Sequence, residues 1–538
     1  MAGFATKLTR WAAVAAVALL AVWAHALPTV EKALPLGNNT QGIQVDPVLG
    51  QVYVSNFNDG TGTVVDIKSL TVAATVSGGT NPRRLVDDAA RHRVYVVEAT
   101  TPGMLRVADA TGATPTVHIP VGNNPRTLGS NLDLGRVYVT NVDDNTVSVV
   151  DTTSNAVIAT LPVGGSAGTP VSNAILKKVY VPNSTDGTVT VIDEAGLTVI
   201  KTVTVGRGPQ YCAVDGQHNK VYVNNVTDKT ISVIDSATDT VIKTIPSGAG
   251  TTNNFGAVNA VYRRYYLPNQ TDGTLTIVNT DTDAVTNTVA VGTSPFDVLP
   301  DGVGGDVYVV NQGSNSVSVI NAASEANLGS FAVGGAPWRM ADGLGHLFIL
   351  NTNGANPDSM TIATENNSIA NTAIATEFYH KDFNHYFHTA DESETRVLQD
   401  GLFHDDWHRT FQYFRVWTIP GPARLPVSRF FSTQWGSESS HFYTANQDER
   451  NKLVSGIIPG WQLEADAVYY IVLADAAGNC PAGTVPLYRL FNNGQGGAPN
   501  HRFTIDRATR DAMQGQGWVG EGSGPDTVYG CVPTLTSG

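Results

Sequence analysis

The chain has little of several features that mark common protein classes. Its 538 residues include only three cysteines, and charged residues make up 15% of the composition. Without a Cys-x-x-Cys-His segment or a vicinal cysteine pair, neither c-type haem attachment nor quinoprotein chemistry is indicated. Lysine and arginine form no run, and the net charge is -14. An acidic chain repels phosphate backbones, so we do not expect nucleic acid as a partner.

Long hydrophobic runs are also missing, except at the N-terminus. Lys7 and Arg10 precede an apolar stretch from Trp11 to Trp23, and Ala24-His25-Ala26 follows. This order is typical of a secretory signal peptide, with a retained anchor as the alternative. We therefore expect residues 1–26 to be removed and the mature protein to have no membrane span. The predicted location is the periplasm, the cell surface or the outside of the cell.

The three cysteines fit an oxidising compartment. Cys480 and Cys531 both lie near the C-terminus beside turn residues, and we predict that they form a disulfide. Cys212 lies within a predicted strand and is expected to be a small buried apolar residue. The histidines of the first 365 residues recur at no fixed position, so the sequence predicts no metal site and no cofactor there.

One motif recurs eight times, consisting of a basic or polar residue followed by Val-Tyr-Val-x-Asn or a close variant. Arg136–Asn141 is an example, and the aromatic residue recurs every 40–44 residues from Tyr53 to Phe348. Each period contains four short runs rich in β-branched residues, separated by Asp, Asn and Gly turns. Four short strands per period of this length predict a β-propeller blade. The sequence therefore predicts an all-β propeller of about eight four-stranded blades, with seven as the alternative.

The two ends of the repeat region suggest how the ring closes. The eighth copy lacks a fourth strand, and residues 29–34 resemble the fourth strands of other copies. We expect this N-terminal segment to complete the last blade and to cover its open edge. The repeats over about residues 28–365 resemble the YVTN-family β-propeller repeat. That resemblance implies the fold strongly and the function weakly, because such propellers occur in surface-layer proteins, binding proteins and some enzymes.

The start of each innermost strand is expected to lie at one mouth of the central channel. Polar, basic and aromatic residues at this position could hold an anionic or sugar-like ligand, or they could simply solvate the rim. The candidates are Gln41, Arg83, Arg126, Gln210, Phe296 and Trp338. Recurring aspartates end the third strands and are interpreted as turn caps. They are Asp66, Asp109, Asp151, Asp193 and Asp235.

After a polar linker at 366–375, a second and longer repeat occupies residues 376–538. Its core sequences begin at His385, His441 and His501, and each is followed by a helix-like polar segment, a Trp and an aromatic strand. Three copies of about 55 residues predict a smaller threefold-repeat, β-trefoil-like domain. The pattern over residues 376–533 resembles DUF5648, a repeat domain appended to secreted bacterial hydrolases and surface proteins.

The aromatic repeats suggest sugar binding, because sugar CH groups stack on aromatic rings while hydroxyl groups find polar partners. The candidates are His385, His441, His501, Trp407, Trp461 and Trp518. The alternative is that these residues form the shared core of the repeats. A metal site at His380, His385 and His388 is disfavoured, because alternation along one strand places them on different faces.

No catalytic residues are predicted. The sequence favours an exported, non-catalytic binding or interaction protein, with the propeller as scaffold or ligand platform and the C-terminal module as a carbohydrate- or cell-surface-targeting device. The expected partner is a glycan or another surface protein. A lactonase- or lyase-like propeller enzyme and a structural surface-layer component are the alternatives.

Overall fold

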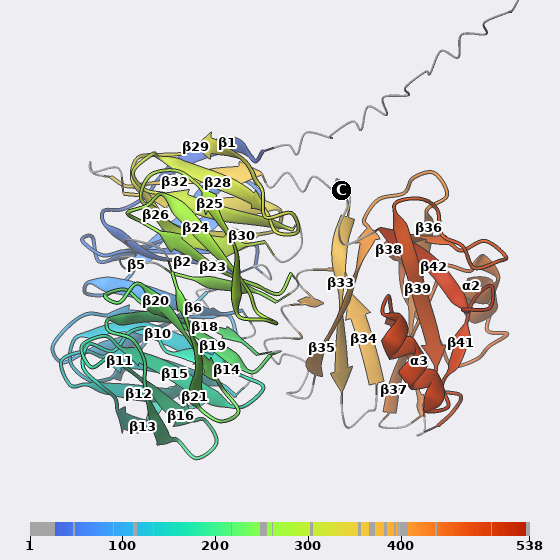
Figure 1. The fold of residues 1–538 in the computed structure, drawn as a ribbon, viewed down its shortest axis with the longest axis horizontal. Helices are drawn as coiled ribbons and strands as arrows, with labels where there is room; N and C mark the ends of the chain where they lie inside the picture. Colours follow the sequence, from blue (N-terminus) through green and yellow to red (C-terminus); the bar gives the residue numbers. More distant parts are fainter. Residues whose placement is uncertain are drawn as a thin grey trace, which may run out of the picture.

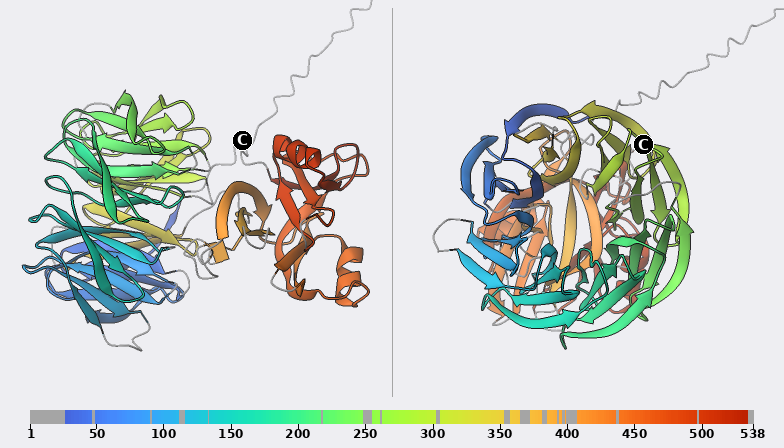
Figure 2. Two further views of the ribbon diagram at one scale, coloured as in Figure 1. Left: turned by 90° about the horizontal axis from the view of Figure 1, so that it is seen from below. Right: turned by 90° about the vertical axis from the view of Figure 1, so that its left-hand side faces the viewer.

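The computed structural model describes residues 27–533, except for 47–48, 90, 111–115, 133, 217, 248–254, 261, 302–304, 353–356, 365–371, 381–384, 392–393, 396–397, 399–406, 436–437 and 496–497. The predicted signal peptide lies outside the described residues. The chain forms a propeller and a separate C-terminal domain (Figure 1). Figure 2 shows the ring of blades face-on, with the C-terminal domain behind it. Within the described part, no helix is long and apolar enough to cross a membrane.

The propeller has eight blades, each an antiparallel sheet of four strands, as predicted. The first four blades consist of β2 (Thr40–Asp46), β3 (Gln51–Asn56), β4 (Thr61–Asp66) and β5 (Thr71–Ser77); β6 (Pro82–Asp88), β7 (Arg93–Glu98), β8 (Met104–Asp109) and β9 (Val117–Pro120); β10 (Pro125–Asn131), β11 (Arg136–Asn141), β12 (Thr146–Asp151) and β13 (Ala156–Pro162); and β14 (Val171–Asn173), β15 (Lys178–Asn183), β16 (Thr188–Asp193) and β17 (Thr198–Thr204). The next three consist of β18 (Pro209–Asp215), β19 (Lys220–Asn225), β20 (Thr230–Asp235) and β21 (Thr240–Pro246); β22 (Ala257–Asn259), β23 (Arg264–Asn269), β24 (Thr274–Asn279) and β25 (Ala284–Ala290); and β26 (Pro295–Pro300), β27 (Asp306–Asn311), β28 (Ser316–Asn321) and β29 (Asn327–Ala332).

The eighth blade joins both ends of the repeat region. It contains β30 (Pro337–Gly343), β31 (His346–Asn351), β32 (Ser359–Thr364) and, as its outer strand, β1 (Thr29–Pro35). β1 pairs antiparallel with β32, and Leu34 stands opposite Met360. The expected closure is therefore present, and the N-terminal strand covers an edge that would otherwise be open.

The repeated motif links neighbouring blades in the middle of the ring. There the buried motif tyrosine donates a hydrogen bond to an acidic residue of the following blade: Tyr138 to Glu194 at 3.0 Å, Tyr180 to Asp239 at 2.9 Å and Tyr222 to Asp283 at 2.7 Å. The basic residue that starts the motif pairs with the same acid, as Lys178 does with Asp239. One carboxylate thus satisfies two donors across the seam between blades, which explains why this pair of residue types recurs.

The asparagine that ends the motif serves the turn between the second and third strands. Asn141 is buried, and its side-chain amide donates to the hydroxyl groups of Thr146 and Ser148 at 3.0 and 2.9 Å. At the end of the third strand, Asp151 accepts hydrogen bonds from the backbone N–H groups of Thr153 and Ser154. Asp66, Asp193 and Asp235 make equivalent contacts. These aspartates are turn caps, as expected.

The C-terminal domain is built on a ten-stranded sheet and contains three repeats. Its elements are β33 (Thr372–His380), β34 (His385–Thr389) and β35 (Trp407–Trp417); β36 (Leu425–Trp435), β37 (Glu438–Thr444), α2 (Gln447–Val454) and β38 (Gln462–Leu473); and β39 (Thr484–Phe491), β40 (His501–Thr504), α3 (Arg507–Gly515), β41 (Val519–Glu521) and β42 (Val528–Pro533). β33 begins at Thr372, inside the predicted linker. α2 and α3 are capped by Asn446 and Asp506 and coincide with the helix-like segments seen in the sequence.

Two features hold the C-terminal domain together. Cys480 and Cys531 form the predicted disulfide, whereas Cys212 is buried and free in the propeller. Ion pairs also join successive repeats. Arg429 makes a bidentate pair with Glu394 of the first repeat, and Arg489 makes the same pair with Glu449 of the second.

The mouth of the channel and the C-terminal domain lie at opposite faces of the propeller. β32 starts beside the mouth end of β31 and finishes beside its other end, at His346. The chain therefore leaves the propeller at the far face. On that face Tyr262, in the loop between β22 and β23, is hydrogen-bonded to Arg415 of β35. The mouth is left uncovered by the C-terminal domain.

Candidate functional site

The residues predicted at the channel mouth do converge. Gln41, Arg83, Arg126, Gln210, Phe296 and Trp338 come from six different blades and line one pocket of about 280 Å³. Phe255, which the sequence did not identify, supplies the contribution of the sixth blade. This volume lies just below the usual range for small-molecule sites, about 300–1,000 Å³.

A second set of channel residues was missed by sequence reasoning. Arg84 and Tyr211 also line the pocket, and Asp297 and Arg339 are packed against it. Each follows a mouth residue directly, and strict alternation would turn it away from the channel. The innermost strands instead carry a β-bulge at this point, for example between Pro337 and Arg339. A bulge re-aims side chains, so two consecutive residues face the channel.

Aromatic rings form one wall of the pocket. Tyr211 packs edge-on against Phe255 at 5.1 Å between ring centroids, Phe255 lies 5.9 Å from Phe296, and Phe296 lies 6.3 Å from Trp338. The indole N–H of Trp338 is buried and has no hydrogen-bond partner among the described residues. The wall therefore offers ring faces together with one unused donor.

The channel contains more basic than acidic side chains. The guanidinium of Arg339 lies 3.6 Å from the carboxylate of Asp297 and 3.4 Å from the centroid of the Phe255 ring. Arg84 forms no hydrogen bond or ion pair within the described part of the chain, and its guanidinium lies 5.3 Å from the Phe255 ring. Burial, together with the charge of Arg339, holds the pKa of Arg84 well below its usual range. Asp297 thus pairs with only one of these two guanidinium groups, and Arg83 and Arg126 add further positive charge at the mouth.

One turn at the same mouth has the sequence pattern of a serine-hydrolase nucleophile. Gly164–Gly168 fits the Gly-x-Ser-x-Gly pattern, and Ser166 has a positive φ of 54°. However, Asn39 and Asn124 occupy the same turn in other blades with φ of 56° and 49°, so this conformation belongs to the repeat. No histidine is among the described residues that line the pocket. The arrangement lacks the base that a serine nucleophile requires.

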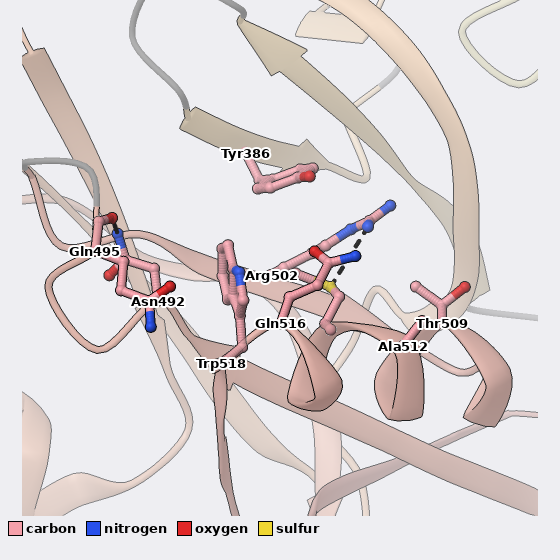
Figure 3. A pocket seen from close by; sticks show the side chains of 9 residues that line it. Tyr386, Asn492, Gln495, Arg502, Thr509, Ala512, Gln516 and Trp518 are labelled. Atoms are coloured by element: carbon pink, nitrogen blue, oxygen red, sulfur yellow. Dashed lines mark hydrogen bonds between the residues drawn. The ribbon is translucent and has the colours of Figure 1, made fainter.

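The C-terminal domain has a pocket of its own, of about 460 Å³. Figure 3 shows Tyr386, Arg502, Gln516 and Trp518 around one space. Tyr386 and Trp518 pack edge-on at 6.1 Å between ring centroids. Asn492, Gln495, Thr509, Ala512 and Met513 complete the lining. An open wall of two aromatic rings beside amide groups is the chemistry that suits a sugar face.

This pocket lies where the third repeat meets the first. It is open because two residues here differ from their equivalents in the other repeats. At the other two junctions an arginine pairs with a glutamate, but here Glu377 stands in the arginine position and Thr509 in the glutamate position. Glu377 is paired instead with Arg502 at 3.0 Å and accepts a hydrogen bond from Thr410 at 2.6 Å. The shorter Thr509 side chain lines the pocket. One of three equivalent junctions is therefore open.

The remaining predicted residues of this domain lie in or against its core. His385 and His501 are buried, and a ring nitrogen of His385 lies 3.0 Å from one of His441. Trp407 packs on His385 and Phe387, and Trp461 packs on Phe442. Of the six candidates, only Trp518 lines the pocket. Within the described residues, no group of three His, Cys, Asp or Glu side chains could hold a metal ion.

Comparison with known proteins identifies a family for one part of the chain. Residues 375–526 match the DUF5648 family. The family is described as a domain of unknown function. No curated protein matches the chain in sequence. Among solved structures, hydrazine synthase from Kuenenia stuttgartiensis is similar at 14% identity and a TM-score of 0.42, over 62% of this chain and 97% of that chain.

Proposed function

We propose that this chain is an exported binding protein whose propeller channel takes a small organic anion, with an acidic sugar unit as the best fit. The observation that carries the proposal is the pair of channel arginines, because Asp297 pairs with Arg339 and Arg84 has no ion pair among the described residues. Holding two guanidinium groups away from water beside one carboxylate is costly, and an anionic ligand would offset that cost.

The walls of the channel support a ligand with flat apolar faces. Phe255, Phe296 and Trp338 present aromatic rings, and Gln41 and Gln210 supply amides at the rim. Sugar rings combine CH faces with hydroxyl groups, so an acidic sugar would use the rings, the amides and the arginines together.

The test is binding of the full-length protein to an array that contains uronic-acid oligosaccharides and their neutral counterparts. We expect the acidic members to bind more tightly than their neutral counterparts, and we expect this difference to depend on Arg84. Replacing Arg84 with Gln removes a charge-assisted hydrogen bond, which should weaken binding about ten- to a hundredfold. Arg263→Ala is the matched control, because Arg263 is exposed in the loop before β23, at the face opposite the mouth, and pairs with Asp281. Acidic binding that survives Arg84→Gln unchanged would refute the channel site.

A second binding role is proposed for the DUF5648 domain. Its support is the single open junction with Tyr386 and Trp518 side by side. We expect it to hold a neutral sugar unit and so to direct the protein to a glycan surface. Trp518→Ala should abolish array binding to neutral glycans, whereas Trp461→Ala, at a closed junction, should not. Equal effects of the two variants would argue against a specific site at Trp518.

A further inference from the structure

The seam between the first and second blades differs from the other seams of the propeller. A pocket of about 480 Å³ opens there, lined by residues of β3, β4, β5, β6, β7 and β8. The apolar cluster at this seam has four buried members, Tyr53, Leu85, Val94 and Val96. The cluster around Tyr138, at the seam between the third and fourth blades, has eight. The first seam therefore buries fewer apolar side chains than the equivalent seam between the third and fourth blades.

One side of the pocket is created by a glycine. Gly62 occupies the second position of the third strand, where the other blades have Leu105, Val147, Val189, Ile231, Leu275, Val317 and Met360. All seven of these side chains are fully buried. Val76, which stands opposite Gly62 on the outer strand, is 44% exposed. Its counterparts opposite the larger residues, such as Leu161 and Ile245, are at most 9% exposed.

The other side of the pocket carries a buried charge. Arg106 occupies a position where every other blade has Ser or Thr, and it is only 9% exposed. Its guanidinium reaches the hydroxyl groups of Ser77 and Thr116 at 3.4 and 3.3 Å, which are long contacts. Its Nε has no hydrogen-bond partner within the described residues. A buried guanidinium is normally paired with a carboxylate, so an anionic group from a ligand would stabilise Arg106 here.

Glu98 does not neutralise the charge of Arg106. It takes the place of the motif asparagine in this blade, and it accepts a hydrogen bond from the backbone N–H of Thr80. Within the described residues Arg106 forms no ion pair with Glu98, although both lie on the same blade. Asp109 also lines the pocket.

We propose that this seam is a second ligand site, distinct from the channel, and that it binds an amphipathic monocarboxylate. Val64, Val76, Leu85 and Val96 would surround the apolar body of the ligand, and the carboxylate would pair with Arg106 in bidentate fashion. The two departures from the repeat act together, because Gly62 provides the space and Arg106 provides the charge. A ligand with a single anionic head and an apolar tail satisfies both.

The probe is octanoate, an eight-carbon monocarboxylate, titrated into the full-length protein by isothermal calorimetry, with octanol as the uncharged counterpart. We expect one saturable octanoate site and at least tenfold weaker binding of octanol. Arg106→Gln keeps a polar side chain but removes the charge, and should weaken octanoate binding at least about tenfold. Arg207→Ala removes an exposed arginine elsewhere and should leave binding unchanged.

Gly62→Val tests the space independently of the charge. A Cβ at position 62 would lie 3.2 Å from a methyl group of Val76, so the new side chain would close the seam as in the other blades. We expect octanoate binding to be lost while the thermal unfolding midpoint is kept or raised, which shows that the variant is folded. Absence of octanoate binding by the unaltered protein, or binding that survives both Arg106→Gln and Gly62→Val, would overturn the proposal.

Discussion

Acidification is expected to destabilise the C-terminal domain well before the carboxylates titrate. His385 and His388 are 1% and 3% exposed, and burial holds the pKa of each well below its usual value of 6.5. Both are therefore neutral in the folded domain. The unfolded chain binds protons at these histidines as the pH falls through 6.5, so the folded state loses stability from that point downward.

The size of the effect follows from proton linkage. At pH 5.5, one unit below the unfolded pKa, each histidine that stays neutral in the fold costs about 1.4 kcal/mol of unfolding free energy. His385 and His388 together give about 3 kcal/mol. Burial also lowers the pKa of His441 and His501, but Glu464 and Glu521 oppose this, so their contribution is smaller. For a domain of this size, a loss of about 3 kcal/mol lowers the midpoint by roughly 6–12 °C.

Tryptophan fluorescence is a suitable assay because the tryptophans are unevenly placed. Five of the eight lie after residue 376, two lie in residues 1–26, and only Trp338 is in the propeller. Thermal unfolding followed in this way at pH 7.5, 6.5 and 5.5 should show a falling midpoint for the C-terminal domain. His385→Gln should flatten the pH dependence, whereas the same change at His118, which is exposed in the propeller, should not. Equal midpoints at pH 7.5 and 5.5 would refute the reasoning.

Three further predictions concern stability. Deleting residues 27–35 removes β1 and exposes the edge of β32. We therefore expect a lower unfolding midpoint for the propeller, and association of the protein in light scattering. A variant that stays monomeric with an unchanged midpoint would contradict the closure argument. Replacing Cys480 and Cys531 by Ser removes a cross-link spanning 51 residues, which should cost about 2–4 kcal/mol in urea unfolding, and an unchanged midpoint would count against it. Asn141→Ala leaves the half-buried hydroxyl of Thr146 and the buried hydroxyl of Ser148 without their donor and should cost about 1–3 kcal/mol, with a similar loss for the equivalent Asn225→Ala.

The architecture of the propeller was predictable because its signal is repeated. The motif tyrosine marks the second strand of each blade, and the spacing of 40–44 residues leaves room for three more. Closure by β1 was predictable for the same reason, since residues 29–34 match the pattern of an outer strand. The pairing of Lys178 and Tyr180 with Asp239 was not, because a contact between blades leaves no mark on the pattern of a single repeat.

The channel site was predictable only in part. The mouth residues follow a fixed turn, and six of them were found from that turn alone. Phe255 was missed because the sixth blade is two residues longer than most of the others and the turn is not repeated there. Arg84 and Arg339 were missed because a bulge breaks the alternation on which side-chain direction is inferred. In the C-terminal domain, core residues and pocket residues recur equally in the three repeats. The sequence therefore could not show that His385 is a core residue and that Trp518 lines a pocket.

Both pockets outside the channel arise where two adjoining copies each depart from the repeat. Gly62 replaces a large apolar residue in the first blade, and Arg106 replaces a Ser or Thr in the second. Glu377 and Thr509 replace the arginine and glutamate that close the other junctions of the C-terminal domain. A random loss of packing would be expected to leave an apolar void, since removing a side chain does not create a charge. Here each departure comes as a pair, and each leaves a polar or charged group, Arg106 or Arg502, on the wall of the new space. Paired departures of this kind are what a binding site requires, because a ligand needs both room and a partner for its polar group.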